Sequence, residues 1–446
     1  MKVVLWFLIF FLPLHAFLVT LLKCKYGVNT DILRFWKEIL VAGMALILFF
    51  QAYKKYDWSL KKLYHKNTLL GLITAFVISS AIYMYFPFFE LKAAAVLWFR
   101  YDVFFLIALL VWLYGWFLWE LRFFLKILFI STFAILSIFL PWYIFWDIST
   151  LSSMFGYSSE VSTYTANQCI SFAQNVNGQH RFQGTFGGPI RFSVFLTIIG
   201  SLFTWWTLSN TNFSQKQKYI LLSLATIFIL PAIFFSYSKT SLLGVLFAVI
   251  VFSFLNYKYI HKKEITRRFY MRLFALCMAP IALVALLKWE LFLHLGAVIN
   301  RLENLSKSIE MFFYNPIGYG LGIAGPASQI GNSIESAGNW QIATSTTHTI
   351  HKFLPENWYV QILLEQGIIW FALFVSLIVL IWYRLVDRIK KHRDYLSIGI
   401  TTAYFALCFM ALFTHAFEEA ATSYILFFFI WIILADSMYK EQHRKK

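Results

Sequence analysis

The sequence predicts an all-α, polytopic membrane protein with about twelve transmembrane helices. Of its 446 residues, 60% are hydrophobic and only 13% are charged, whereas roughly a quarter of the residues of a soluble globular protein are charged. The mean hydropathy of +0.67 agrees with this composition. These values exclude a soluble enzyme, a disordered chain and a fibrous protein.

Long apolar stretches recur along the whole chain. A membrane-spanning helix needs about 20 mostly apolar residues, because the hydrocarbon core is roughly 30 Å thick and each residue rises about 1.5 Å. Several stretches are short for a span, so a count of eleven or thirteen stays open. No small-residue cleavage site follows the first, which is therefore expected to be a retained span. The expected spans are 3–22, 35–53, 69–88, 93–118, 123–146, 190–208, 219–236, 240–256, 273–293, 358–382, 397–415 and 421–436.

The basic residues predict the orientation of these spans. When both termini are placed in the cytoplasm, most of the 38 Lys and Arg residues fall in the short inner loops and the tail, as the positive-inside rule requires. In a soluble protein, the net charge of +17 would suggest nucleic acid as a partner. Here it is first a topology signal, and no nucleic-acid partner is expected.

Two long connections, 147–189 and 294–357, then fall on the outer side of a single membrane domain, 1–446. All other loops are short. Long irregular segments in a compact chain are usually functional or disordered, and these two contain Gly, Pro and aromatic residues. We expect them to be folded and to carry the chemistry of the protein.

The first outer loop ends in a glycine-rich turn flanked by Arg181 and Arg191. Such a turn exposes backbone N–H groups, and two guanidinium groups offer forked donors that suit phosphate oxygens. The segment is therefore a candidate anion site at the outer membrane face. The alternative for Arg191 is that its side chain only extends to the membrane interface.

Lys239 lies at the outer junction of the seventh and eighth expected spans, in the segment Ser236-Tyr-Ser-Lys-Thr-Ser241. A cation near the membrane without an acidic neighbour in sequence is a functional candidate. The alternative is a lysine that lies only at the interface.

The second outer loop opens with an amphipathic stretch, in which Val298, Leu302, Leu305, Ile309 and Phe312 follow helical spacing. Most such helices lie on the membrane interface. Arg301 is the residue of this stretch that could point inward. The glycine-rich run at 315–322 has the wrong spacing and context for a dinucleotide-binding fingerprint.

The end of this loop leads into the tenth expected span. Asn357, Gln361 and Glu365 recur at every fourth residue and so share one helix face, which we expect to line a cavity rather than to contact lipid. Glu356 at the outer mouth is a candidate general base if burial raises its pKa. The alternative is that its carboxylate caps the helix N-terminus.

Metals, cofactors and disulfides have little support in the sequence. His348 and His351 are three residues apart, but no third metal ligand is identifiable, so we expect no metal and no cofactor. The four widely spaced Cys residues form no framework or CxxC site. Cys24 and Cys169 are both assigned to the outer side, and whether they pair stays open.

Further charges close to the expected spans favour an enclosed polar site, with interhelical ion pairs as the alternative, above all for Glu38 and Asp102. Glu418 and Glu419 lie on the outer side, near the last hairpin. The other charged residues of this kind are Arg34, Lys37 and Arg100.

Several motifs, taken in order, resemble those of the O-antigen ligase and O-antigen polymerase superfamily. The most extensive is Pro355-Glu-Asn-Trp-Tyr-Val-Gln-Ile-Leu-Leu-Glu-Gln-Gly367, which is similar to the family's run of Tyr-Leu-Gln-x-Leu-x-Glu-x-Gly. Four shorter segments also resemble family elements: the second-span run Phe35-Trp-Lys-Glu-Ile39, the outer-loop run Arg181-Phe-Gln-Gly-Thr-Phe-Gly-Gly-Pro189, the 236–241 segment, and Arg301 followed by Asn315-Pro-Ile-Gly-Tyr-Gly320.

The resemblance implies a metal-independent glycosyltransferase of the C-type architecture in the bacterial inner membrane. Its donor would be an undecaprenyl-diphosphate-linked oligosaccharide at the periplasmic face, and its acceptor a lipid-linked repeat unit or lipid A-core. Arg181, Arg191, Lys239 and Arg301 would hold the donor diphosphate as leaving group. A chain-length regulator protein would be a further partner.

The resemblance also separates two activities. Ligases usually have His where this chain has Glu356, which favours a polymerase of O-antigen or another surface polysaccharide. His348 or His351 could take the histidine role, which keeps a ligase as the alternative. A flippase or transporter is the more distant alternative, but no repeat between the two halves of the chain is visible.

Overall fold

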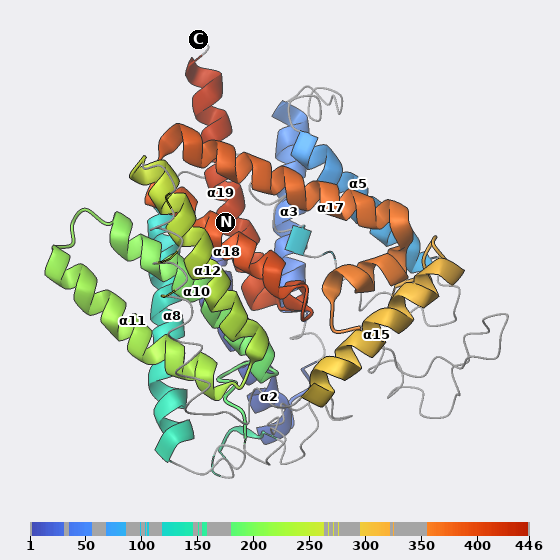
Figure 1. Ribbon diagram of the computed structural model, residues 1–446, viewed down its shortest axis with the longest axis horizontal. Coiled ribbons are helices and arrows are strands. Elements are labelled where there is room, and N and C mark those ends of the chain that lie inside the picture. Colours follow the sequence, from blue (N-terminus) through green and yellow to red (C-terminus); the bar gives the residue numbers. More distant parts are fainter. Residues whose placement is uncertain are drawn as a thin grey trace.

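The structure is a computed structural model in which the longest described segments are 2–30, 35–55, 68–85, 118–145, 180–262, 295–321 and 355–444. Isolated positions between them are also described: 99, 103, 105, 106, 150, 154–157, 266, 271, 275 and 324. The described part of the chain is all-helical and contains no strand, which confirms the predicted fold class at that level (Figure 1).

The described helices coincide with ten of the twelve apolar stretches; the other two, 93–118 and 273–293, lie largely outside the described residues. The α-helices are α1 Lys2–Phe11, α2 His15–Thr20, α3 Trp36–Lys55, α5 Thr68–Tyr85, α8 Leu118–Phe145, α10 Pro189–Ser209, α11 Gln215–Phe235, α12 Lys239–Leu255, α15 Leu295–Tyr314, α17 Trp358–His392, α18 Tyr395–Met410 and α19 Ala420–Arg444. Shorter 3-10 or π turns are η1 Leu12–Leu14, η2 Leu21–Lys25, η3 Asn256–Ile260 and η4 Ala416–Glu418.

Within the described residues, six helical segments are long and apolar enough to cross a membrane, and three shorter apolar helices accompany them. The six are Val3–Lys25, Leu121–Phe145, Pro189–Ser209, Gln215–Phe235, Lys239–Ile260 and Trp358–His392. These helices support a multi-pass membrane protein. A count of twelve spans for the whole chain stays a prediction, as do the two long outer loops. The second of these begins with α15, a regular helix.

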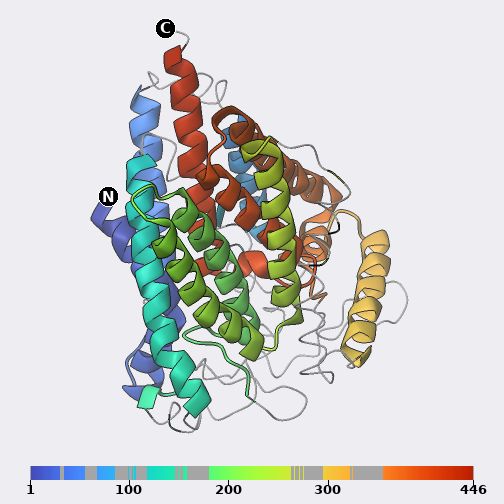
Figure 2. The same cartoon turned by 60° about the vertical axis from the view of Figure 1, so that its left-hand side comes forward.

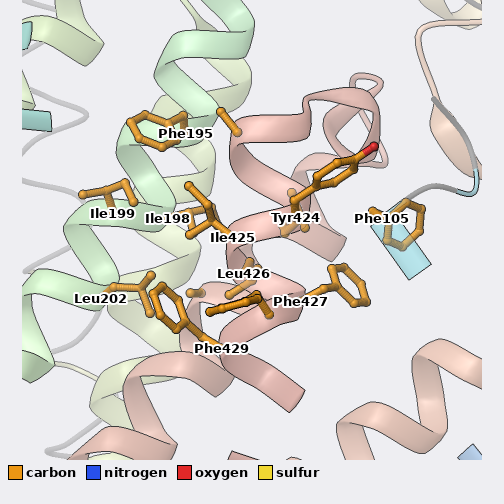
Figure 3. Packing of buried hydrophobic residues seen from close by; sticks show 14 of the residues in the cluster. Phe105, Phe195, Ile198, Ile199, Leu202, Tyr424, Ile425, Leu426, Phe427 and Phe429 are labelled. Atoms are coloured by element: carbon orange, nitrogen blue, oxygen red, sulfur yellow. The ribbon is translucent and has the colours of Figure 1, made fainter. Parts of the chain in front are cut away.

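Helix α10 lies in the centre of the bundle and packs against α18, α12 and α19 (Figures 1 and 2). Figure 3 shows Ile198 and Leu202 of α10 facing Ile425 and Phe429 of α19, with Ile199 in the same buried cluster. All these side chains are fully or almost fully buried. Close packing of this kind joins helices in a membrane, where lipid removes the hydrophobic driving force between them.

Helix α11 is peripheral, in contrast to α10. Ile220, Leu224, Ile227 and Leu230 are exposed at steps of four, three and three residues and therefore share one face. An apolar face without protein neighbours suits contact with lipid chains. The bundle thus has a protein-packed interior around α10 and lipid-compatible faces outside.

Helix α17 is broken near its start, where the chain after α15 packs into it. Gly367 has non-helical backbone angles (φ 76°, ψ −178°). The N–H groups of Tyr319 and Gly320 donate to the carbonyls of Leu364 and Glu365 at 2.8 and 2.9 Å, and Ile368 donates to the carbonyl of Pro316 at 2.9 Å. The break thus frees backbone groups that the 316–320 segment satisfies.

The close backbone approach at this crossing requires glycine. Gly318 and Gly367 both have positive φ angles, and a Cβ on Gly318 would lie 2.6 Å from the Gly367 nitrogen. A Cβ on Gly367 would overlap the carbonyl of Ile317. The crossing holds α15 against α17, which otherwise meet mainly through Met311, Tyr319 and Leu364.

We expect Gly367→Ala to destabilise the protein by about 1–3 kcal/mol, because the substitution adds both a steric overlap and an unfavourable backbone conformation. The matched control is Gly43→Ala in α3, where no atom lies within 4 Å of the added Cβ and alanine favours the helix. Thermal unfolding of the two purified variants in detergent measures the difference. Equal melting temperatures would show that the crossing is not a structural constraint.

Candidate functional site

A group of polar side chains gathers where α11 and α12 meet the end of the 180–188 segment. The N–H of Phe182 donates to the carbonyl of Phe235 at 2.9 Å. Arg181 Nε donates to the Ser236 carbonyl at 2.8 Å, and Arg181 Nη2 lies 3.4 Å from the Tyr237 carbonyl. Arg181 therefore joins the 180–188 segment to the turn between α11 and α12.

The charge of Arg181 is held in a poorly solvated position. Burial, together with the smaller effect of the nearby positive charge of Arg301, lowers the pKa of Arg181 to about 10. The guanidinium remains protonated at neutral pH. Arg181 is thus a poorly solvated cation that is close enough to Arg301 for the two charges to repel each other.

Lys239 is placed by a hydroxyl network at the start of α12. Ser238 is the N-cap, and its Oγ accepts from the N–H of Ser241 at 3.3 Å. Ser241 Oγ also lies 2.7 Å from Ser193 Oγ of α10. The first residue of α12 is therefore fixed beside the first turns of α10, and the charge of Arg301 acts on Lys239 as it does on Arg181.

Arg301 lies on the face of α15 that is turned toward the bundle, together with Ser308 and Met311, which are buried. Arg301 Nε donates to Glu356 Oε2, and the two side chains form an ion pair. Both side chains are little more than one third exposed, at 37% and 38%. The pair joins α15 to the residue just before α17.

Glu356 does not cap α17. Asn357 is the N-cap, and its Oδ1 accepts from the N–H groups of Tyr359 at 3.0 Å and Val360 at 3.2 Å. Glu356 has a positive φ of 47°, which is unfavourable for a non-glycine residue. The capping alternative for Glu356 is therefore wrong, and its carboxylate is directed to Arg301 instead.

Two of the three residues of the polar stripe, Gln361 and Glu365, are buried in α17. Gln361 and Glu365 have no solvent exposure, and the N–H of Ala324 donates to Glu365 Oε1 at 3.2 Å. Gln361 and Glu365 thus face protein, but whether Asn357, Gln361 and Glu365 line a cavity stays a prediction.

A comparison with known protein families found a match for part of the chain. The family model described as O-antigen ligase matches residues 224–375. This segment of the chain is similar to that family. The match supports the O-antigen ligase and polymerase superfamily that the sequence motifs resemble, and an enzyme that transfers glycans. No curated protein matches the chain.

The matched domain, residues 224–375, contains Lys239, Arg301 and Glu356, together with both glycines of the backbone crossing. Arg181 and Arg191 lie before it in the sequence. The structure nevertheless brings Arg181 to the domain, through its contact with Ser236.

Arg191 is oriented differently from Arg181. Its Nε lies 3.9 Å from Glu419 Oε2, in the connection between α18 and α19. Arg191 therefore has a carboxylate partner outside the matched domain. Its predicted contact with a diphosphate stays a prediction.

The same connection carries His415, which the sequence analysis did not single out. The side chain of His415 is 9% exposed, and its Nδ1 lies 3.7 Å from Glu418 Oε1. Burial lowers the pKa of His415 to about 3, and the charge of Arg191 acts in the same direction. The imidazole is therefore neutral at physiological pH. A lone His at the end of an apolar stretch gives no sequence pattern, although the two acidic residues after it were a signal.

Two buried charged residues of α3, Lys37 and Glu38, add to the group of Arg191, His415 and Glu419. Lys37 Nζ lies 3.1 Å from Glu38 Oε1 and 3.0 Å from His15 Nε2. Burial raises the pKa of Glu419, while the positive charges of Arg191 and Lys37 lower it. These residues connect α2, α3, α10 and the α18–α19 connection. The ion pair of Glu38 is with Lys37, its neighbour on the same helix. The interhelical ion pair expected for Glu38 therefore stays a prediction.

The remaining predicted site residues, His348 and His351, lie outside the described residues. Within the described part of the chain, no three His, Cys, Asp or Glu side chains gather as metal ligands. The catalytic candidate that the structure describes is therefore Glu356.

We expect Asn357→Ala to lower the free energy of unfolding by about 1 kcal/mol, because two backbone N–H groups at the start of α17 lose their acceptor. Asn357→Asp retains an acceptor and should unfold like the unmodified protein. Chemical or thermal unfolding in detergent tests both variants. If Glu356→Ala is destabilising while Asn357→Ala is neutral, Glu356 is the cap.

Proposed function

We propose that the protein is a membrane glycosyltransferase that uses an undecaprenyl-diphosphate-linked glycan as donor at the periplasmic face. The observation that carries the proposal is the ion pair of Arg301 and Glu356 inside the O-antigen ligase domain, next to two further cations. The partners are the lipid-linked donor, an acceptor glycan and, by resemblance to the family, a chain-length regulator.

The charge balance of the site suits a diphosphate. The positive charge of Arg301 acts on both Arg181 and Lys239, and Glu356 is the carboxylate paired with Arg301. Cations that repel one another without full compensation favour an anionic ligand. Guanidinium groups bind phosphate oxygens with two parallel hydrogen bonds. The same groups stabilise the negative charge that develops on the departing lipid diphosphate.

Glu356 is the general base in this proposal. Its carboxylate accepts the proton of an acceptor sugar hydroxyl while the hydroxyl oxygen forms a bond to the anomeric carbon of the donor. The bond between that carbon and the diphosphate oxygen breaks, and the lipid diphosphate leaves with the electron pair. Arg301 contacts Glu356 before reaction and lies next to the other cations, so it can orient the base and the leaving group together.

A polymerase of O-antigen or another surface polysaccharide is the favoured activity, because this chain has Glu356 where ligases usually have His. The alternative is a ligase that transfers the glycan to lipid A-core, with His348 or His351 in the histidine role. A flippase is the more distant alternative. Against it, Lys239 is the first residue of α12 and Arg181 contacts the turn before that helix, so neither cation lies in the middle of a span.

Two observations support a periplasmic site with both termini in the cytoplasm of a bacterial inner membrane. Cys24, at the end of η2, is disulfide-bonded, and disulfides persist in oxidising compartments such as the periplasm. The opposite ends of the helices that reach the site are basic: Lys216 and Lys218 begin α11, while Lys390 and Lys391 end α17. Basic residues favour the cytoplasmic side.

We expect Arg301→Ala and Glu356→Ala to reduce glycan transfer at least about 100-fold, since each removes a group that acts on the transition state. Membrane insertion should be unaffected. The matched controls are Lys307→Ala and Glu303→Ala, which remove exposed charges from the other side of α15 and should leave transfer unchanged. Transfer by the purified variants is measured with lipid-linked oligosaccharide as donor. Wild-type activity in either site variant would refute the assignment.

A second experiment separates the two activities. When the purified protein receives undecaprenyl-diphosphate-linked repeat units alone, we expect longer lipid-linked glycans to form, because a polymerase uses the same molecule as donor and acceptor. Gel separation of the glycans measures their length. Product that forms only after lipid A-core is added would instead identify a ligase.

A further inference from the structure

We propose that Arg191, His415 and Glu419 form a subsite that binds hydroxyl groups of the acceptor sugar. This subsite is separate from the residues proposed to hold the donor diphosphate, and it rests on the proposed glycosyltransferase function. It is built by the first turn of α10 and the connection between α18 and α19.

His415 is the strongest indication of a ligand. Its side chain is nine-tenths buried, and among the described residues neither ring nitrogen has a hydrogen-bond partner. The distance of 3.7 Å between Nδ1 and Glu418 Oε1 is too long for a hydrogen bond. A buried polar group without a partner destabilises a protein, and such groups in native structures call for an explanation. A bound hydroxyl would supply the missing partner.

The chemistry of the group suits a sugar hydroxyl. Burial keeps His415 neutral, with a pKa of about 3, so its ring offers one N–H donor and one acceptor. Arg191 Nε and Glu419 Oε2 are 3.9 Å apart, which exceeds hydrogen-bond length. A hydroxyl oxygen between them could accept from the guanidinium and donate to the carboxylate.

The charge balance distinguishes this subsite from the residues proposed to hold the donor diphosphate. Lys37 is paired with the carboxylate of Glu38, Arg191 lies near that of Glu419, and Glu418 adds a third carboxylate beside His415. Such surroundings disfavour a diphosphate, because the carboxylates repel it and already compensate the cations. A neutral molecule with many hydroxyl groups pays no such cost.

The subsite also lies beside the proposed base. The N–H of Trp358 donates to the Ala411 carbonyl at 3.0 Å, and the rings of Trp358 and Phe417 lie 4.6 Å apart. The connection that carries His415 and Glu419 therefore packs on the residue two positions after Glu356. A hydroxyl-bearing sugar held here is close to the chain segment that would remove its proton.

The domain boundary is consistent with this division. Residues 224–375 match the O-antigen ligase family and include Lys239, Arg301 and Glu356. Arg191 and the α18–α19 connection lie outside the matched residues. A function that differs between enzymes with a common donor, such as the choice of acceptor, is expected outside the shared domain.

The decisive variant is His415→Phe, which keeps a ring of similar size but removes both nitrogens. If His415 only fills space, the change should be neutral for transfer and should stabilise the protein, because an unsatisfied buried polar group is removed. If His415 binds the acceptor, the protein should be stabilised while the apparent KM for the acceptor rises about tenfold. The KM for the lipid-linked donor should not change.

Glu419→Gln is the second variant, and it should also raise the acceptor KM while retaining a side chain of the same size. Glu310→Gln, an exposed carboxylate on α15, is the matched control. The assay uses lipid-linked repeat unit as donor, and as acceptor either the repeat oligosaccharide released from its lipid or lipid A-core, whichever the unmodified protein extends. Thermal unfolding of each variant is measured in parallel.

The outcomes separate this inference from the proposed function. Unchanged acceptor KM in both His415→Phe and Glu419→Gln, or an equal loss for donor and acceptor, would overturn the subsite. If the unmodified protein extends neither acceptor, the proposed function itself fails, and the subsite fails with it. An acceptor KM that rises in both variants with donor KM unchanged supports the subsite.

Discussion

The backbone crossing of Gly318 and Gly367 is the constraint on which the proposed site depends. Helix α15 is peripheral (Figure 2), and its main attachments to the bundle are the hydrogen bonds between 316–320 and the break in α17. Arg301 can meet Glu356 only if α15 and the start of α17 keep their relative position. Because glycine alone tolerates this approach, a purely structural feature fixes the geometry of the proposed chemistry.

The charged residues around Arg301 and those around Arg191 differ in how their charges are compensated. Glu356 is the carboxylate paired with Arg301, whose positive charge also acts on Arg181 and Lys239, so the group proposed to hold the donor diphosphate retains a positive excess. The group around Arg191 and Lys37 is balanced by carboxylates and contains a neutral imidazole. Buried and partly buried charges are costly unless they are paired. The uncompensated excess and the unsatisfied imidazole are therefore the two places where a ligand would contribute most to stability.

The sequence predicts most of the helices, because length and hydropathy determine which segments can be buried in lipid. It also identifies Arg301 and Glu356 as candidates, but not their ion pair, since the two residues are 55 positions apart and their contact depends on the glycine crossing. A Gly within an apolar helix pattern does not reveal whether the helix breaks, so the change of backbone at Gly367 was not predicted. Asn357 was assigned to a cavity, whereas capping of α17 by its side chain is a local effect that competes with that role.

The arrangement of helices suggests how donor and acceptor chemistry can vary independently. Helix α10 carries Arg191 at its first turn and packs along α18 and α19, while Ser193 of the same turn bonds to Ser241 beside Lys239. The start of α10 is therefore a rigid link between the two charged groups. Suppose that the residues around Arg301 and Glu356 release the lipid diphosphate, and that the α18–α19 connection selects the acceptor. Substitutions near His415 and Glu419 then change the acceptor without altering the position of Arg301 and Glu356. A polymerase and a ligase would then differ chiefly in this connection and in the base at position 356, which is an economical way for one donor chemistry to serve both.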